Sequence, residues 1–167
     1  MGFLPNNNLK ITLINLKRSK VDLPYFTSIE GNATDLRQFK NDQFDVVFSN
    51  SVIEHLYSWE NQVAMAKEVV RVGKHFFVQT PNFGFPVEPH FVFPFFHYLP
   101  QTSRIWLTKN YDLGHYPRAK NEQEARRRIE ELKLLSIKDM KALFPGAKIY
   151  REQVWGLTKS IIAHNFK

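Results

Sequence analysis

Three small hydrogen-bonding residues and a histidine follow one apolar run of the sequence. The run, Phe44–Phe48, is succeeded by Ser49, Asn50 and Ser51 and then by His55. A short run of β-branched and aromatic residues is typical of a strand that is buried on both faces. Ligands of open α/β sheets bind beyond the carboxyl ends of the strands. We therefore expect this stretch to mark a site; the alternative is a buried strand that simply ends in a polar turn.

His55 is the strongest candidate for a group that accepts a proton, because imidazole titrates near neutrality and this residue lies just beyond the expected strand. Alternatively, it caps a turn or forms a hydrogen bond with the serine-rich loop. His90 and His97 are weaker candidates, and no metal site is expected from them. Glu88 could orient a substrate, but we expect it to be exposed to solvent.

Length and composition indicate one globular domain of 167 residues, with 43% hydrophobic and 23% charged residues. The absence of cysteine excludes disulfides, thiolate zinc sites and cysteine nucleophiles, and it fits a cytoplasmic location. The net charge of +7 comes from scattered lysines and arginines, so we expect a solvated basic surface rather than a nucleic-acid site. The run Arg126–Arg128 is interpreted in the same way. No run approaches the ~20 apolar residues of a membrane span.

The first half of the sequence alternates between strand-like and polar segments. Apolar runs that are flanked by Asn or Gly predict strands. Ser58 is suited to begin a helix and Gly73 to end it. Apolar strands joined by a helix of this length favour a parallel sheet. The expected elements are strands over Leu9–Leu16, Tyr25–Glu30, Phe44–Phe48 and His75–Thr80, one helical turn in Ala33–Phe39, and a helix between Ser58 and Gly73.

Pro81–Pro100 has a different character, because five of the nine prolines and many of the aromatic residues lie there. Prolines at this spacing prevent a long helix before Pro100. A long loop without structure in a compact domain is usually functional, so we interpret the segment as a lid or substrate wall. The alternative is an aromatic flap that covers the sheet or a partner chain.

The last part of the chain predicts helices and then a hairpin. Asn121 and Ser136 are suited to cap helices, and Asp139 completes a capping box with Ser136. The expected elements are a helix over Gln101–Lys109 with Ile105 and Trp106 inward, a helix over Asn121–Leu135, a helix from Ser136 to Phe144, and antiparallel edge strands over Ala147–Val154 and Gly156–Phe166.

The stretch Phe44–Leu56 closely resembles the central strand and following loop of class I S-adenosylmethionine-dependent methyltransferases of the small-molecule "type 11" kind. Gly31–Leu36 resembles the turn that holds adenine in that family, and Glu68–Gly73 resembles its helix-to-strand step. The resemblance implies an α/β fold: a Rossmann-like, mostly parallel twisted sheet with helices on both faces and a C-terminal antiparallel hairpin.

The same resemblance implies S-adenosylmethionine as cofactor and a small molecule as methyl acceptor. His55 stays the candidate catalytic residue because of its residue type and position. The resemblance implies that the following residues contact the cofactor: Asn15, Asn32, Ala33, Ser49 and Asn50.

Three departures from the family pattern concern the cofactor. The family's first strand and its glycine-rich turn have no counterpart, and Asn15 and Asn32 stand where the family has acidic residues. An amide accepts a weaker hydrogen bond than a carboxylate does. The missing strand would lie between Leu9–Leu16 and Phe44–Phe48. We therefore expect a single, N-terminally truncated domain over residues 1–167 that starts late, with an insertion over 81–100; the alternative is that another segment or chain fills the gap.

Two functions are compatible with these observations. The first is in-line methyl transfer from S-adenosylmethionine to a small molecule, in which orientation alone can contribute ~7–11 kcal/mol. The second is a non-catalytic remnant or interaction module that kept the sheet and lost the cofactor site. Nucleic-acid binding ranks last, because the sequence lacks the interleaved basic and aromatic pattern of RNA-binding strands. The sequence leaves the oligomeric state open.

Overall fold

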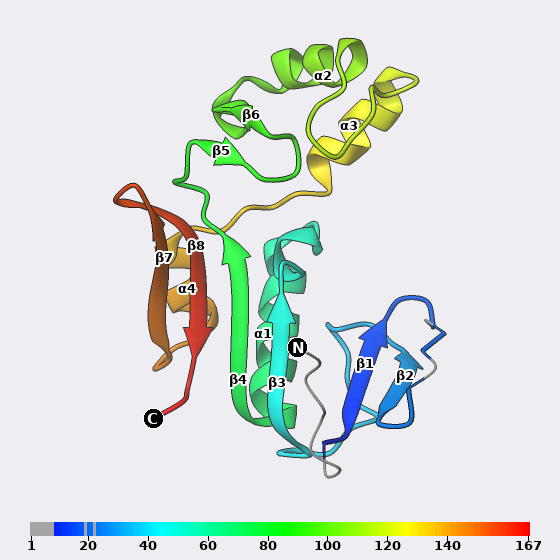
Figure 1. Cartoon of the computed structure of the whole chain (residues 1–167), viewed down its shortest axis with the longest axis vertical. Helices are drawn as coiled ribbons and strands as arrows, with labels where there is room; N and C mark the ends of the chain where they lie inside the picture. Colours follow the sequence, from blue (N-terminus) through cyan, green and yellow to red (C-terminus); the bar gives the residue numbers. More distant parts are fainter. Residues whose placement is uncertain (1–8, 19, 22) are drawn as a thin grey trace, which may run out of the picture.

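The computed structural model describes residues 9–18, 20–21 and 23–167. Four strands in the first half point in the same direction (Figure 1). They are β1 (Ile11–Asn15), β2 (Phe26–Glu30), β3 (Phe44–Asn50) and β4 (Gly73–Pro81). β1 pairs with β2 and β3 pairs with β4, both in parallel, so their carboxyl ends lie toward one edge of the molecule. The strands predicted from the sequence are confirmed in place and direction.

The C-terminal hairpin completes the larger sheet. β7 (Lys148–Val154) and β8 (Leu157–His164) pair in antiparallel fashion, and β8 also pairs antiparallel with β4. The strand order is therefore β3-β4-β8-β7, with β7 at the edge and β8 inside the sheet. The fold class is confirmed as α/β with a Rossmann-like sheet that combines parallel and antiparallel strands.

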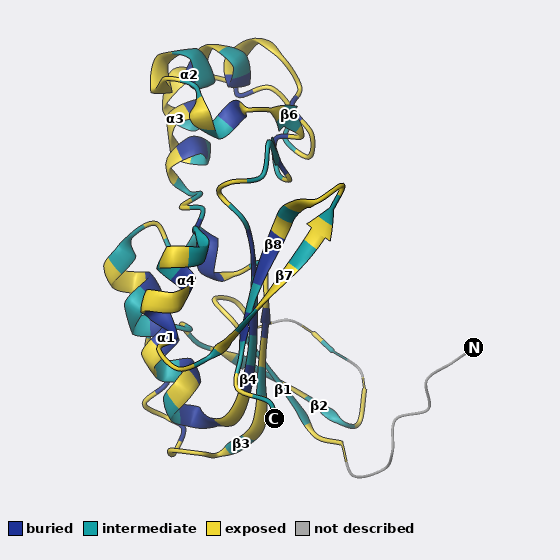
Figure 2. Cartoon of the chain, turned by 90° about the vertical axis from the view of Figure 1, so that its left-hand side faces the viewer, coloured by how far each residue is buried: buried dark blue, intermediate teal, exposed yellow. Residues whose placement is uncertain are grey.

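Two helices cover one face of this sheet, as Figure 2 shows. α1 (Trp59–Val72) begins at Ser58, whose hydroxyl accepts a hydrogen bond from the Asn61 backbone, and α4 (Ile137–Leu143) begins with the predicted capping box. Their apolar sides form the main core with β3, β4 and β8. The prediction placed helices on both faces. The prediction that Phe44–Phe48 is buried on both faces is wrong, because Val46 and Phe48 on the uncovered face are 50% and 69% exposed.

The pair β1-β2 forms a sheet of its own, and among the described residues no strand lies between β1 and β3. A small core of Leu36, Phe39 and Val72 joins this pair to α1. The segment Ala33–Phe39, predicted to contain a helical turn, forms hydrogen-bonded turns instead. It is fixed to α1 through Arg71, which donates to the carbonyls of Leu36 and Phe39.

The middle of the chain builds a second body, called the upper body below, above the carboxyl ends of β3 and β4 (Figure 1). It consists of β5 (Val87–Glu88), β6 (Phe93–Pro94), the short 3-10 turn η2 (Phe96–Tyr98), α2 (Gln101–Asn110) and α3 (Glu122–Glu130).

Phe91 and Phe96 stack with their ring centroids 4.1 Å apart, and they anchor an apolar core of this body. The prediction that Pro81–Pro100 contains no long helix is confirmed. The segment is nevertheless not structureless, because its aromatic side chains pack against α2 and α3.

Two details of this body differ from the sequence prediction. Ile105 is buried as expected, but Trp106 is 56% exposed, because adjacent residues of a helix point in different directions and only one faces the core. α3 ends at Glu130 rather than at Leu135. Arg126 and Arg127 form exposed ion pairs, as predicted, whereas Arg128 folds against the Tyr116 ring and pairs with Glu124.

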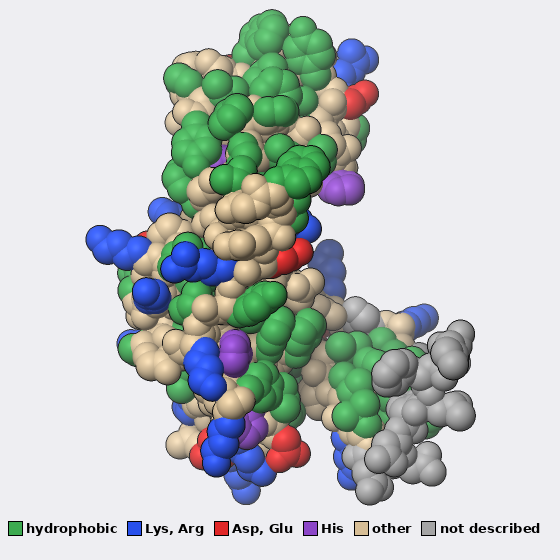
Figure 3. Space-filling view, turned by 60° about the vertical axis from the view of Figure 1, so that its left-hand side comes forward, with side chains coloured by type: hydrophobic (Ala, Val, Ile, Leu, Met, Phe, Trp, Pro, Cys, Tyr) green, Lys and Arg blue, Asp and Glu red, His purple; other side chains and the backbone are tan. Residues whose placement is uncertain are grey.

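Hydrophobic side chains gather on the surface of the upper body (Figure 3). Its exposed aromatic residues include Phe95, Tyr98 and Trp106. Within the described ranges, no helix combines the length and the apolar character that crossing a membrane requires.

Candidate functional site

The chain turns sharply at the carboxyl end of β3. Ser51 adopts a left-handed backbone conformation with φ of 53°, and Tyr57 does so with φ of 60°. Non-glycine residues rarely adopt this conformation, and such residues cluster at functional sites. The Ser51 hydroxyl donates to Gln79 Oε1 over 3.0 Å, which ties the turn to β4. Between the two strained residues lies the 3-10 turn η1 (Ile53–His55).

The side chain of Gln62 on α1 fixes η1 by hydrogen bonds. Its side-chain amide donates to the carbonyl of Ile53 over 3.1 Å and to the carbonyl of Lys133 over 3.0 Å. The backbone N–H of Lys133 in turn donates to the carbonyl of Glu54 over 2.7 Å. Three segments that are distant in sequence thus fix the orientation of Glu54 and His55.

Glu54 is completely buried, with 0% of its surface exposed. Thr80 Oγ1 donates to its Oε2 atom over 3.1 Å, whereas its Oε1 atom has no hydrogen-bond partner. Burial raises the pKa of this carboxyl group above its ordinary value. A buried carboxylate oxygen without a partner is rare in proteins and calls for a ligand or a function.

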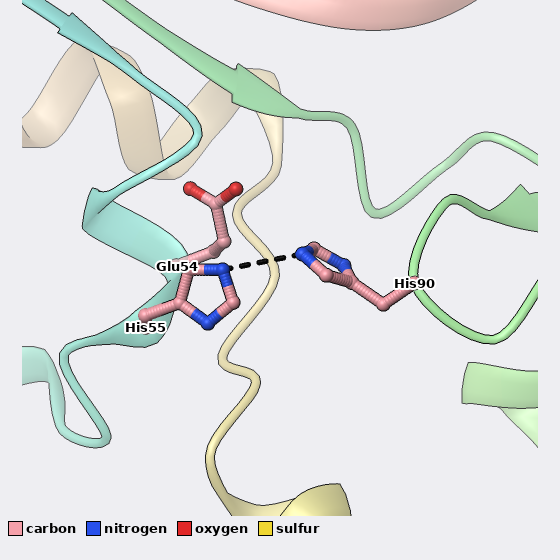
Figure 4. Close-up of side chains that lie close together, drawn as sticks. All are labelled: Glu54, His55 and His90. Carbon is pink, nitrogen blue, oxygen red and sulfur yellow. Dashed lines mark hydrogen bonds between the residues drawn. The ribbon is translucent and has the colours of Figure 1, made fainter. Parts of the chain in front are cut away.

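His55 and His90 face one another across the gap between η1 and the β5–β6 loop (Figure 4). Their Nε2 atoms are 3.2 Å apart, and the two rings are nearly perpendicular. Burial, and then the charge of His90, lower the pKa of His55, which favours the neutral form of this imidazole. The prediction that His55 lies at a site beyond β3 agrees with this arrangement; its catalytic role stays a prediction.

Glu88 was predicted to be exposed, and this prediction is wrong, because only 2% of its surface is exposed. Its Oε1 atom lies 2.5 Å from His90 Nδ1, and its Oε2 atom accepts from the backbone N–H groups of His90 and Phe91. The hydrogen bond with Glu88 raises the pKa of His90.

A cavity of about 260 Å³ opens beside Glu88 in the upper body. Its wall includes Phe83, His97, Arg104 and Lys133 in addition to Glu88. His97 does not join the histidine pair: its Nε2 atom contacts the carbonyl of Phe83 at 2.8 Å. The Nε atom of Arg104 is buried without a hydrogen-bond partner, and burial lowers the pKa of this guanidinium.

The residues predicted to contact the cofactor lie at the ends of β1, β2 and β3. Ser49 is buried at the end of β3, and its hydroxyl has no hydrogen-bond partner. Asn50 is exposed beside it. Asn15 is exposed at the end of β1, in the separate two-stranded sheet, and its carbonyl accepts from the Gly31 backbone.

Asn32 and Ala33 form the turn after β2. The side-chain oxygen of Asn32 accepts a hydrogen bond from the Thr34 backbone over 3.0 Å, and Ala33 packs against the main core. These residues fit S-adenosylmethionine in part. The orphaned Ser49 hydroxyl is a free polar group at the correct strand end. The side-chain oxygen of Asn32, by contrast, already accepts a hydrogen bond from Thr34. In addition, β1 and β3 belong to different sheets.

Sequence reasoning missed the contact between His55 and His90 and the burial of Glu54 and Glu88. The position of Glu54 next to His55, in the loop that resembles the family, was a signal that could have identified it. The contact between His55 and His90 spans 35 positions. It depends on how Pro81–Pro100 folds, for which the sequence carried no local signal.

Comparisons with known proteins support the family resemblance of the loop after β3. Residues 6–78 match the family model described as a methyltransferase domain. An uncharacterized protein of Mycobacterium tuberculosis is 36% identical over 63 residues, which cover 38% of this chain and 22% of the relative. The match therefore spans about a fifth of the length of that relative.

Two solved structures were also found to be similar. A protein of Rhodobacter sphaeroides, described as a Zn-dependent alcohol dehydrogenase, shares 13% identity with a TM-score of 0.50, covering 83% of this chain and 65% of that one. A S-adenosylmethionine-dependent methyltransferase of Methanosarcina mazei shares 13% identity with a TM-score of 0.44, covering 83% and 66%. The match to the methyltransferase-domain model over residues 6–78 agrees with the resemblance to class I S-adenosylmethionine-dependent methyltransferases that the sequence indicated.

Proposed function

We propose that this protein transfers a methyl group from S-adenosylmethionine to a small-molecule acceptor by in-line displacement. The observation that carries the proposal is the family-like loop after β3, which directs Glu54 and His55 to the carboxyl edge of the parallel strands. Ligands of open α/β sheets bind at this edge. The cofactor, when bound, supplies an activated methyl group, and the protein contributes chiefly by orienting the acceptor.

In this proposal the cofactor lies along the ends of β1, β2 and β3. Asn15 would accept from the ribose, the Asn32–Ala33 turn would border the adenine, and Ser49 and Asn50 would line the remaining side. The Ser49 hydroxyl is buried and free to form one further hydrogen bond. A cytoplasmic location, where such a cofactor is available, is part of the same proposal.

His55 would accept the proton that an acceptor hydroxyl or amine loses during transfer. Its Nε2 atom contacts Nε2 of His90 at 3.2 Å, so Nδ1 is the ring nitrogen that would accept the proton. His90 would act as a positioning residue, because Glu88 holds its ring from the opposite side. The chain Glu88–His90–His55 therefore orients the proton-accepting ring.

The acceptor itself is proposed to enter from the cavity beside Glu88. At about 260 Å³, this cavity is close to the lower end of the ~300–1,000 Å³ that small-molecule pockets usually have. Arg104 and Lys133 are cationic groups on its wall. A small acceptor that carries a negative group would suit this wall best.

The second candidate function is a non-catalytic interaction module. It is favoured by the separation of β1-β2 from the sheet and by the engaged oxygen of Asn32. Both observations weaken the part of the site that would hold the cofactor, without affecting the histidine pair.

Isothermal titration with S-adenosylmethionine separates the two candidates. The enzyme proposal predicts saturable 1:1 binding with a Kd well below about 1 mM, which corresponds to a binding free energy more favourable than ~4 kcal/mol. ATP serves as a control, because it contains the same adenosine but is anionic and would bind non-specifically to a basic surface. Absence of heat with millimolar S-adenosylmethionine would overturn the enzyme proposal and leave the interaction module.

A further inference from the structure

Three potential metal ligands converge where η1 meets the β5–β6 loop. One carboxylate oxygen of Glu54 and one nitrogen each of His55 and His90 lie within 4.8 Å of one another. Figure 4 shows the two rings pointing toward each other, with the Glu54 carboxyl group on one side of their contact. The three side chains come from two segments that are held by separate cores, so their approach is a property of the fold.

The distance between the two histidines suits a shared ion. Zinc–nitrogen bonds of ~2.0–2.1 Å at a tetrahedral angle place two ligand nitrogens about 3.3 Å apart. The Nε2 atoms of His55 and His90 are 3.2 Å apart. The rings therefore already have the separation that a common ion requires. The Glu54 oxygen is the more distant ligand, and a rotation of its side chain would bring it closer.

Glu88 supplies the support that metal-binding histidines usually have. It lies at hydrogen-bond distance from Nδ1 of His90, while two backbone N–H groups hold its other oxygen. A proton held on Nδ1 leaves the lone pair of Nε2 directed at His55. Metal-ligating histidines nearly always donate their other ring N–H to a carboxylate or carbonyl, and this contact fixes the tautomer.

An independent observation points to a ligand at the same place. The Oε1 atom of the completely buried Glu54 has no hydrogen-bond partner. Leaving such an atom unsatisfied is costly, and Thr80 satisfies only the other oxygen. A cation bound by Glu54 and the two histidines would give this carboxyl group a further partner. Two buried carboxyl groups, Glu54 and Glu88, also give this small volume a negative charge when they are ionised.

We propose that Glu54, His55 and His90 bind a divalent transition-metal ion, with Glu88 as the residue that positions His90. Two imidazoles and one carboxylate suit zinc and its neighbours in the first transition row rather than magnesium or calcium, which prefer oxygen ligands. Three protein ligands leave at least one coordination position open for a water molecule or for an oxygen atom of a substrate.

The binding itself does not depend on methyl transfer; only its role rests on the proposed function. An ion bound to Nε2 of His55 would leave the ring proton on Nδ1, the nitrogen that otherwise accepts a proton. The ion would then polarise the acceptor oxygen in place of that base. The two roles of His55 exclude each other, so measuring metal occupancy decides between them.

The test is a titration of the chelator-treated full chain with Zn²⁺ by calorimetry and with Co²⁺ by visible absorption. The proposal predicts one ion per chain, a Kd in the low micromolar range or below, and a Co²⁺ spectrum of a site with nitrogen ligands. His90→Ala and His55→Ala are each expected to weaken Zn²⁺ binding at least 100-fold. Glu88→Gln, which leaves all three ligands in place, is expected to weaken it 10- to 100-fold.

His75→Ala is the matched control, because His75 is an exposed histidine on β4 outside the cluster. Its Kd for Zn²⁺ should equal that of the unchanged protein, and circular dichroism should show that every variant is folded. The proposal is overturned if the unchanged protein shows no saturable binding at 100 µM Zn²⁺, or if folded His90→Ala binds as tightly as the control. Neither result depends on S-adenosylmethionine, whose binding is tested separately.

Discussion

The two pairs of parallel strands differ in how well their carboxyl ends are supported by buried contacts. At β3 and β4, the buried side chains of Glu54, Gln62 and Glu88 hold two histidines in contact. At β1 and β2, the candidate cofactor residues Asn15 and Asn32 are exposed, and their strands form a sheet of only two strands. Two-stranded sheets are marginally stable without further packing. The comparison teaches that the chain holds the histidine pair through buried contacts, whereas the strands proposed to contact the cofactor are less supported.

The largest expected effect comes from breaking the support of the β3 end. Gln62→Leu keeps the approximate shape but removes both hydrogen bonds to the carbonyls of Ile53 and Lys133. We expect the free energy of unfolding to fall by about 2–4 kcal/mol, because two buried acceptors lose their donor. Urea unfolding measures this change.

Asn61→Ala is the matched control for that variant. Asn61 is the adjacent residue of α1, is exposed, and donates one side-chain hydrogen bond, to the carbonyl of Leu56. Its loss should cost less than about 1 kcal/mol. Equal effects of the two variants would contradict the view that Gln62 holds η1.

The next effect concerns the attachment of the β1-β2 side to α1. Arg71→Met removes the hydrogen bonds to the carbonyls of Leu36 and Phe39 and the ion pair with Glu68. A loss of about 1.5–3 kcal/mol is expected, since charged groups make the stronger hydrogen bonds. Arg127→Met is the control, because the pair of Arg127 with Glu131 is exposed and worth ~0–1 kcal/mol. A loss no larger than that of the control would show that the attachment lies elsewhere.

Acid should loosen the same attachment. The hydrogen bond from Arg71 lowers the pKa of Glu68 below its ordinary value. A carboxyl group with a lowered folded-state pKa stabilises the fold above its unfolded-state pKa, and this contribution is lost as the pH falls through the folded-state pKa. Unfolding measured between about pH 6 and pH 3 should therefore depend less on pH in Glu68→Gln than in the unchanged protein. Identical pH profiles would contradict this role of Glu68.

The smallest expected effect is a gain on the cofactor side. Asn32→Asp restores a charged acceptor and can still accept the Thr34 N–H. Charge-assisted hydrogen bonds are about twice as strong as neutral ones, so we expect S-adenosylmethionine to bind roughly 3- to 10-fold more tightly. Asn121→Asp adds the same charge at the cap of α3 and retains the capping hydrogen bond. A gain seen equally in this control would reflect net charge rather than the turn.

Local signals predicted most elements, and long-range packing determined the features that were missed. The caps at Ser58, Asn121 and Ser136 were read from residue types alone, because capping depends only on neighbours in sequence. Glu88 and Trp106 were assigned to the wrong environments, because burial in the upper body depends on how the aromatic segment packs. His55 and His90 were both named as candidates, but the contact between them was not predicted.

Hydrogen exchange of backbone amides tests the difference between the β3-β4 region and the β1-β2 pair most directly. Exchange reports the local free energy of opening. The N–H groups of Gln62, His90 and Phe91 and those of β4 should exchange slowly, near the rate of global unfolding. Those of β1 and β2 should exchange at least 100-fold faster and slow down when S-adenosylmethionine is added. Equal protection of both regions, or faster exchange around Glu54 and His90 than in β1 and β2, would contradict a preorganised site at the β3 end.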